Sequence, residues 1–275
     1  MIRRLLRALL VLVLAGALGI GALFAVSWWD VTHTRLATLQ RSSAHVTGEL
    51  KVLQVTDVHD MGPGEQRDGI VQQATDLQPD LIALTGDLVN MTTRDLSRIE
   101  PFVAQLAATR IPVFYVPGNH EWASGRLPQV VQMLQRHGVV VMQNTHQSLD
   151  GSWGQLDVVG TDDYYSGVGD LAAAMRGTRP EAFHLVLSHS PEGVFDDLAR
   201  HRADLAISGH THGGQIRLPW VGAIYTPGGG LFPRLDKGLF SNGESTLYID
   251  SGVAASIPLR INDRSQITLI TIQPG

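Results

Sequence analysis

Cysteine is absent from the 275-residue sequence. Its absence excludes disulfide scaffolds, thiolate metal sites and cysteine nucleophiles, although a chain without cysteine is stable in either redox environment. A metal ion would therefore be bound by nitrogen and oxygen ligands, which draws interest to the eleven histidines. Charged residues are also few, at 17% against 44% hydrophobic residues. This balance excludes global disorder and fits one large globular domain or two small ones.

The formal net charge of −5 is divided unevenly along the chain. Residues 1–29 contain Arg3, Arg4 and Arg7 and no acidic residue, which leaves 18 basic against 26 acidic residues, a formal charge of −8, for the remainder. An acidic body argues against nucleic acid as a partner, because nucleic-acid binding requires a basic surface. It remains compatible with an anionic substrate at a site where bound cations dominate the local field.

A long uncharged run lies close to the N-terminus. It extends from Ala8 to Trp29 and matches the roughly 20 residues that a helix needs to cross a bilayer. Three arginines precede the run, and two tryptophans end it as an interfacial aromatic belt would. We interpret residues 1–29 as an uncleaved membrane anchor. A cleaved signal segment with a small-residue site at 25–27 is the alternative.

The three arginines are expected to stay on the cytoplasmic side in either case. The body of the protein is then expected to be anchored to the membrane and to face the periplasm or the cell exterior. If the segment is cleaved, the body is expected to be secreted. Residues 30–48 are rich in Thr, Ser and His and are expected to form a polar connector. Residues 49–275 are expected to form one domain.

Short apolar runs alternate with amphipathic stretches in this domain, which indicates an α/β fold with buried sheets. The expected strands are 51–56, 81–85, 113–116, 156–159, 184–188, 205–208, 246–250 and 266–272. The expected helices are 65–77, 94–108, 127–137, 171–176 and 191–201. Residues 209–243 contain nine glycines and three prolines and predict loops and hairpins.

Metal-capable residues directly follow five of the expected strands. The five motifs are Thr56-Asp57-Val58-His59, Gly86-Asp87, Gly118-Asn119-His120-Glu121, Ser188-His189-Ser190 and Gly209-His210-Thr211-His212. Ligands of open α/β sheets bind outside the carboxyl ends of the strands. Alternate residues of an extended segment point to the same face, so each Asp-x-His or His-x-His pair can approach one site. Seven nitrogen and oxygen ligands without sulfur suit two divalent ions, such as Mn, Fe, Zn or Mg, because one ion would leave polar groups uncompensated.

These motifs in this order resemble the calcineurin-like metallophosphoesterase superfamily, from about residue 50 to the C-terminus. Three further segments are similar to its membrane-anchored bacterial phosphodiesterase branch: Leu88-Val89, 188–191 and 209–219. The resemblance implies a four-layer αββα sandwich of two mixed sheets with helices outside, here preceded by one N-terminal transmembrane helix.

The resemblance also implies a ligand role for seven motif residues. The first metal would be held by Asp57, His59 and His212. The second would be held by Asn119, His189 and His210. Asp87 would bridge both ions.

The implied catalytic residues are His120 and Asp87. A hydroxide that bridges the metals would attack phosphorus in line, and His120, which is not a ligand, would assist the leaving group. Supporting roles around the ligands are possible for four residues: Asp60, Glu121, Asp163 and Gln215.

We therefore predict a dinuclear metal-dependent phosphoesterase, membrane-tethered, that favours phosphodiesters or pyrophosphates. One alternative is a lipid-linked pyrophosphatase of the UDP-2,3-diacylglucosamine type. The alternative of a different class is a non-catalytic metal-binding sensor or scaffold on the same fold. The expected partners are the membrane and a phosphoester substrate that is lipid-linked or envelope-derived. Substrate selection is expected in loops 60–64, 122–128, 161–168 and 216–243, and the sequence does not predict the oligomeric state.

Overall fold

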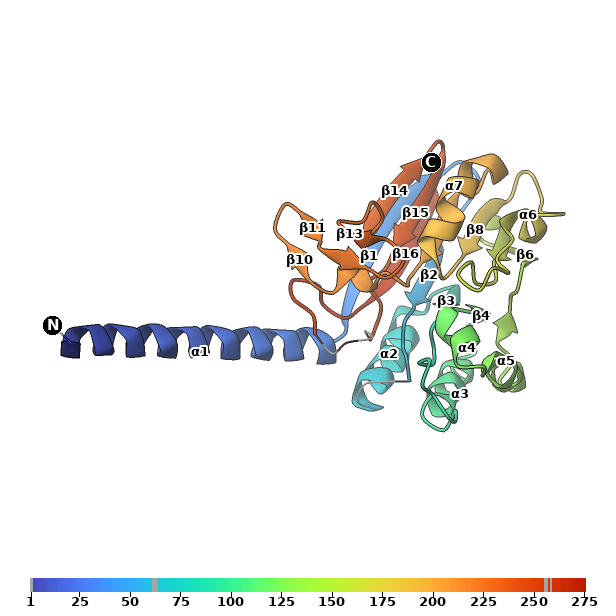
Figure 1. The fold of residues 1–275 in the computed structure, drawn as a ribbon. Helices are drawn as coiled ribbons and strands as arrows, with labels where there is room; N and C mark the ends of the chain where they lie inside the picture. The colour runs from blue at the N-terminus through green and yellow to red at the C-terminus, as the bar shows by residue number, and fades with distance from the viewer. Residues whose placement is uncertain (1, 61–63, 255–256, 258) are drawn as a thin grey trace.

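A computed structural model of the chain describes residues 2–60, 64–254, 257 and 259–275 (Figure 1). Of the loop 60–64, residues 61–63 lie outside the described residues. A long helix, α1 (Ile2–Thr32), extends away from a body made of two six-stranded sheets and their covering helices.

The first sheet has the strand order β1-β16-β2-β3-β4-β5. Its strands are β1 (Arg35–Ser43), β16 (Gln266–Pro274), β2 (Leu50–Val55), β3 (Leu81–Thr85), β4 (Val113–Val116) and β5 (Val140–Val141). Strands β2 to β5 are parallel, β16 is antiparallel to β2, and β1 is parallel to β16. The sheet is therefore mixed.

The second sheet has the order β14-β15-β9-β8-β7-β6. Its strands are β14 (Gly238–Asn242), β15 (Ser245–Ile249), β9 (Leu205–Ser208), β8 (Phe183–Leu187), β7 (Gly154–Gly160) and β6 (Thr145–Gly151). The four central strands are parallel and both edge strands are antiparallel to their neighbours.

Side-chain alternation along the strands produces the layers. Successive residues of a strand point to opposite faces, so Val52 packs between the two sheets, whereas Leu53 packs under the helices outside the first sheet. These outer helices are α2 (Gly64–Leu77), α3 (Glu100–Ala108) and α5 (Leu127–Arg136). Outside the second sheet lie α6 (Leu171–Ala174) and α7 (Pro191–His201). The predicted four-layer αββα sandwich is confirmed.

The region expected to form loops and hairpins after residue 209 contains two small hairpins before β14 begins. Strands β10 (Arg217–Leu218) and β11 (Gly222–Ala223) form the first, and β12 (Tyr225–Thr226) and β13 (Gly230–Leu231) form the second. Strand β14, an edge strand of the second sheet, follows them near the end of the region.

The expected connector at 30–48 requires a correction. Residues 35–43 form β1, which pairs with β16 along its whole length. Most of the side chains of β1 are exposed because it is an edge strand, so the polar sequence carried no apolar pattern. The helix expected at 94–108 is also shorter than predicted: turns occupy the residues before Glu100, and Pro101 stands in the first helical turn.

The end of α1 contacts the body directly. Ser27 is buried and its Oγ accepts a hydrogen bond from the backbone N–H of Arg260 at 3.0 Å. The carbonyl of Asp30 accepts one from the N–H of Ser265 at 2.8 Å. The apolar part of α1 is exposed and long enough to cross a membrane. The predicted N-terminal apolar helix is thus present as a candidate membrane span.

Candidate metal centre

The five motifs meet at one end of the two sheets. Asp57 and His59 follow β2, Asp87 follows β3, and a short helix, α4 (Asn119–Ala123), follows β4. From the second sheet, His189 follows β8 and His210 follows β9. The 3₁₀ turn η1 (His212–Gly214) comes next. All five strands are parallel members of their sheets, so their carboxyl ends lie at the same edge, as expected for an α/β ligand site.

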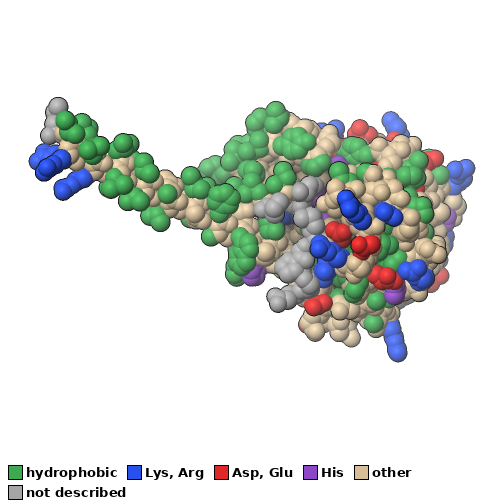
Figure 2. All heavy atoms as spheres, turned by 60° about the horizontal axis from the view of Figure 1, so that its bottom comes forward, with side chains coloured by type: hydrophobic (Ala, Val, Ile, Leu, Met, Phe, Trp, Pro, Cys, Tyr) green, Lys and Arg blue, Asp and Glu red, His purple; other side chains and the backbone are tan. Residues whose placement is uncertain are grey.

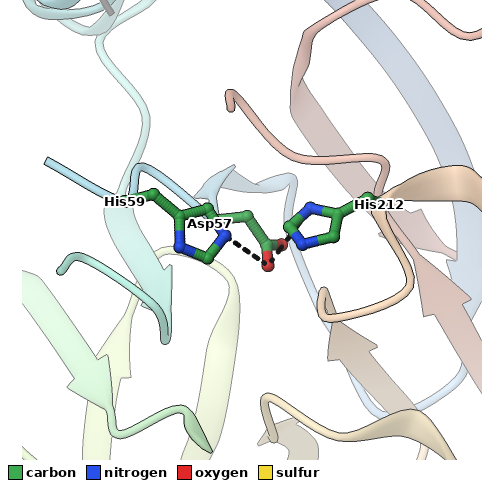
Figure 3. Close-up of side chains that lie close together, drawn as sticks. All are labelled: Asp57, His59 and His212. Carbon is green, nitrogen blue, oxygen red and sulfur yellow. Dashed lines mark ion pairs between the residues drawn. The ribbon is translucent and has the colours of Figure 1, made fainter. Parts of the chain in front are cut away.

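One group of possible ligands centres on Asp57. Its Oδ1 lies 3.8 Å from Nε2 of His59 and 3.7 Å from Nδ1 of His212. Figure 3 shows the two imidazole rings on either side of the carboxylate. The ligand atoms of these three buried residues are close enough to share one metal ion. This is the set that the resemblance implies for the first metal.

A second group centres on Asp87. Its Oδ2 lies 3.3 Å from Nε2 of His189, and His189 lies in turn 3.1 Å from Oδ1 of Asn119 and 3.2 Å from Nδ1 of His210. Asp87 also lies 3.9 Å from Nε2 of His59, so it stands between the two groups. The residues that the resemblance implies for the second metal therefore adjoin one another, and Asp87 lies between them and the first group.

The backbone is strained at five of these side chains. Asp57, His59, Asp87, His210 and His212 all have positive φ angles, between 49° and 69°. This left-handed region is costly for residues other than glycine, and such residues concentrate at functional sites. Neighbouring glycines leave room for the carboxylates. A Cβ at Gly118 would collide with the carboxylate of Asp87, and a Cβ at Gly209 would collide with that of Asp57.

The donor set fits divalent cations. Among the described residues, neither ring nitrogen of His59 nor Nε2 of His210 has a hydrogen-bond partner, although both rings are buried. Burial lowers the pKa of His59 to about 4 and that of His210 to about 3, so both present neutral nitrogens at physiological pH. Buried polar atoms without partners are costly, and a coordinated ion would satisfy them.

His189 carries a proton where a cation would fit. Burial opposes its charge, but the carboxylates of Asp87 and Asp57 outweigh burial and raise the pKa of His189 to about 10. Its Nδ1 donates to the carbonyl of Thr85 at 2.9 Å, which directs Nε2 toward Asp87. Burial raises the pKa of Asp57 to about 7. Both pKa shifts are those expected where buried carboxylates lack a compensating positive charge.

The ring of His120 is oriented by a hydrogen bond from the backbone of a neighbouring loop. Its Nδ1 accepts a hydrogen bond from the backbone N–H of Met91 at 3.2 Å. The hydrogen of the neutral ring is therefore on Nε2, which lies 3.9 Å from Oδ2 of Asp87. Burial lowers the pKa of His120, so the ring is held neutral with one N–H directed into the site.

Glu121 holds together the two loops that carry Asp87 and Asn119. Its buried carboxylate accepts hydrogen bonds from the backbone N–H groups of Asp87 (3.0 Å), Leu88 (2.7 Å), Val89 (3.2 Å) and Gly118 (2.8 Å). Both carboxylate oxygens are used. The possible supporting role expected for Glu121 has a specific physical basis here, because this residue fixes the turn in which Asp87 lies.

The other three candidate supporting residues each make hydrogen bonds to loops near the motifs. Asp60 accepts a hydrogen bond from the Thr93 hydroxyl at 2.6 Å. Asp163 accepts one from Ser190, the residue after His189, at 3.0 Å. Gln215 donates to the carbonyls of Ile257 and Leu259 and so ties η1 to a distant loop. These contacts position loops around the site.

The sequence interpretation did not single out Tyr165, which lies beside the ligands. Its ring packs against that of His210, with the ring centroids 4.5 Å apart, and its hydroxyl donates to Oε2 of Glu192 at 3.1 Å. Tyr165 is partly exposed and lies in the predicted substrate-selecting loop 161–168. Only the proximity of a long loop to a strand end could have indicated it.

Buried acids and histidines at the strand ends of a four-layer αββα sandwich define a metal-dependent hydrolase. A family model described as calcineurin-like phosphoesterase matches residues 50–214. The chain belongs to this family. Family membership, together with clusters that can hold metal ions, confirms the predicted metal-dependent phosphoester hydrolase.

Individual relatives agree with this assignment. A transmembrane protein with metallophosphoesterase domain from Bos taurus is 31% identical over 245 residues, which cover 82% of this chain and 53% of the relative. Phosphodiesterase YaeI from Escherichia coli (strain K12) is 28% identical over 250 residues, 89% of this chain and 88% of the relative. The crystal structure of a dimetal phosphatase from Danio rerio is 14% identical, with a TM-score of 0.53, and covers 82% of this chain and 99% of that chain. This last similarity supports the fold.

Proposed function

We propose that the chain is a dinuclear phosphoesterase whose two divalent ions share Asp87. The observation that carries the proposal is the place of this carboxylate, within 4 Å of imidazole nitrogens of both ligand groups. Asp57, His59 and His212 would hold one ion, and Asn119, His189 and His210 the other. Mn, Fe, Zn and Mg all suit this set of ligands.

When bound, such ions supply an activated water nucleophile and positive charge for the phosphoryl oxygens. Asp57 and Asp87 together contribute a charge of only −2 against the +4 of two divalent ions, so the occupied site would attract an anionic phosphoester despite the acidic body. The neutral His59 and His210 leave that balance unchanged. The remaining work of the protein is to orient the phosphoester and to handle the leaving-group proton.

His120 is the residue we assign to the leaving group. Its Nδ1 is occupied by the N–H of Met91, so Nε2–H is the group available to donate toward a developing oxyanion. The ring is buried, which strengthens a hydrogen bond to a charged oxygen. Asp87 accepts the backbone N–H of His120 at 2.9 Å, which ties this donor to the ligand cluster.

We further propose that α1 is an uncleaved anchor and that the site faces the periplasm or the cell exterior. The helix continues without interruption through residues 25–27, the alternative cleavage site, to Thr32. Ser27 is buried against Arg260, so its contacts belong to the folded body. The three N-terminal arginines support the orientation. Fusion of a reporter that is active only outside the cytoplasm to the C-terminus would test it; an inactive fusion would contradict the orientation.

A phosphodiester or a pyrophosphate is the substrate class we favour. A relative named phosphodiesterase supports the first, and the membrane anchor favours a lipid-linked or envelope-derived compound, including lipid-linked pyrophosphates. A metal-binding sensor or scaffold without catalysis is the candidate from a different class. The presence of Asp87, His120 and every predicted ligand argues against it.

The test uses the full-length protein in detergent micelles. Hydrolysis of an aryl phosphodiester with added Mn²⁺ is the expected result, and Asp87→Asn is expected to abolish it. Asp76→Asn, an exposed carboxylate on α2, is the matched control. A protein that binds metals but hydrolyses no diester, monoester or pyrophosphate would show that the sensor alternative is correct. If hydrolysis is observed, metabolite profiling of envelope extracts treated with the active protein or with Asp87→Asn would identify the substrate.

A further inference from the structure

The two small hairpins after η1 form an unusual surface. Residues 218–233 span the β10–β11 turn and the whole β12–β13 hairpin, and none of them is charged. Large apolar side chains in this run are exposed: Trp220 fully, Leu231 at 71% and Phe232 at 67%, together with Leu218, Val221 and Tyr225. We call these six residues the apolar hairpin surface. Clustered exposed apolar side chains mark interaction sites.

Two of these exposed aromatic side chains stand at positions where the backbone is strained. Trp220 has a φ angle of 63° and Phe232 one of 50°. Turns with positive φ favour Gly or Asn, and a bulky aromatic residue there is a costly exception. Among the described residues, fourteen non-glycine residues have positive φ, and five of the others are metal-ligand candidates. The side chain of Trp220 is fully exposed and that of Phe232 mostly so, so neither gains enough packing within the chain to explain its place, which points to a partner outside it.

The position of the surface indicates which partner. The backbone N–H of Arg217, at the base of β10, donates to the carbonyl of Ile261 at 3.0 Å, and the N–H of the adjacent Arg260 donates to Oγ of Ser27 in α1 at 3.0 Å. The hairpins lie on the side of the body from which α1 leaves (Figure 1). Figure 2 shows apolar side chains gathered on the body where the helix joins it. Trp28 and Trp29 of α1 are exposed at the same junction.

The surface is also connected to the metal centre. It begins six residues after His212, and Nη1 of Arg217 donates to the carbonyl of Gly213 at 2.7 Å. A Cβ at Gly228, in the β12–β13 turn, would collide with the hydroxyl of Tyr165, whose ring packs against His210. The hairpins therefore lie between the end of α1 and the rim of the site.

We propose that the apolar hairpin surface inserts into the interface of the membrane that α1 spans. Apolar and aromatic side chains without charges are the composition that enters the headgroup and acyl boundary. Its position on the side of the body from which α1 leaves selects the lipid surface over a protein partner. The metal centre is then held against the bilayer, at the level of lipid headgroups. This inference rests on the proposed anchor.

The absence of cysteine makes a direct test possible. Single variants Val221→Cys and Leu231→Cys of the full-length chain, spin-labelled and reconstituted in vesicles of phosphatidylethanolamine and phosphatidylglycerol, report their surroundings by collision with oxygen and with an aqueous nickel chelate. Leu18→Cys on α1 is the lipid reference. Ser152→Cys, exposed in the β6–β7 turn at the opposite end of β7 from the site, is the water reference. Unlabelled variants are first checked for unchanged unfolding temperature.

The expected result is high oxygen and low nickel accessibility at Val221 and Leu231, close to the values at Leu18. Accessibility like that of Ser152 at both positions, with Leu18 in lipid, would overturn the docking proposal and leave the anchor intact. Protection from both reagents would assign the surface to a second copy or another protein and would equally overturn it. A water-accessible Leu18 would overturn the anchor and the docking together.

Discussion

The backbone N–H of Met91 donates to Nδ1 of His120 at 3.2 Å and so fixes the ring hydrogen on Nε2, the nitrogen that faces Asp87. A loop that contains no ligand thus determines what the histidine can donate. The contact makes the proposed leaving-group role specific enough to test.

Replacement of His120 by Ala should lower kcat by about 10²–10⁴-fold for a phosphodiester with an alkyl leaving group. The loss should be smaller for an aryl leaving group, because a nitrophenolate needs little protonation. Metal content, measured by mass spectrometry, should not change. His137→Ala, whose ring contacts Glu100 away from the site, is the control. Equal losses on both substrates, or loss of metal, would contradict the assignment.

Replacement of Glu121 by Gln should weaken metal binding by about 10–100-fold. The carboxamide keeps one acceptor oxygen and turns N–H donors toward backbone N–H donors, so the loops at Asp87 and Gly118 separate. A chelator competition measures the affinity, and the exposed Glu181→Gln is the control. An unchanged affinity would show that these loops are held by other contacts.

Metal affinity should rise with pH by about tenfold per unit on the alkaline side of neutrality. His189, with its pKa raised to about 10, keeps its proton in the metal-free protein, whereas a coordinated imidazole has lost it. Binding therefore releases a proton and is favoured as pH rises. Calorimetry in buffers of different ionisation enthalpy should detect this release. Binding that is independent of pH would show that His189 is not a ligand.

Replacement of Arg260 by Met should lower the free energy of unfolding by about 3–5 kcal/mol. The guanidinium is fully buried, pairs with Asp263 at 2.8 Å and donates to the carbonyls of Ser251 and Ala254. Denaturant unfolding of the full chain in detergent measures the loss. Arg234→Met, whose side chain is exposed, should be nearly neutral. A cost below about 1 kcal/mol would mean that water replaces the charge contacts.

The sequence predicted the elements whose side chains are buried. Strands 81–85, 113–116 and 205–208 and helix 191–201 have the predicted bounds, because a buried strand is apolar throughout and a helix against a sheet has an apolar stripe. The edge strands β1 and β6 were not predicted, because their exposed polar residues have no such pattern. The division into two sheets followed from the resemblance, and the order of the strands was not predicted, since short apolar runs do not specify their neighbours.

The candidate site was predictable as a set of residues and less so as a geometry. Asp57, Asp87, His189 and His210 follow apolar runs, so their place at strand ends could be inferred. The left-handed backbone at these positions could not, because Asp and His carry no clear signal for it. Glu121 had a usable signal: an acid at the third position of a helix that accepts the N–H of the preceding cap, Gly118.

The metal centre draws its side chains from both sheets, Asp57 and Asp87 from the first and His189 and His210 from the second. Coordination would add bonds between two sheets that otherwise meet at this edge through apolar packing and a few hydrogen bonds, such as those from His189 to the carbonyl of Thr85 and from the N–H of His210 to Asp57. Metal binding should therefore control cooperativity: amides of β3 and β8 should exchange their hydrogens at one common rate with metal bound and at separate rates after chelation. The enzyme would then sense metal supply through the integrity of its own fold.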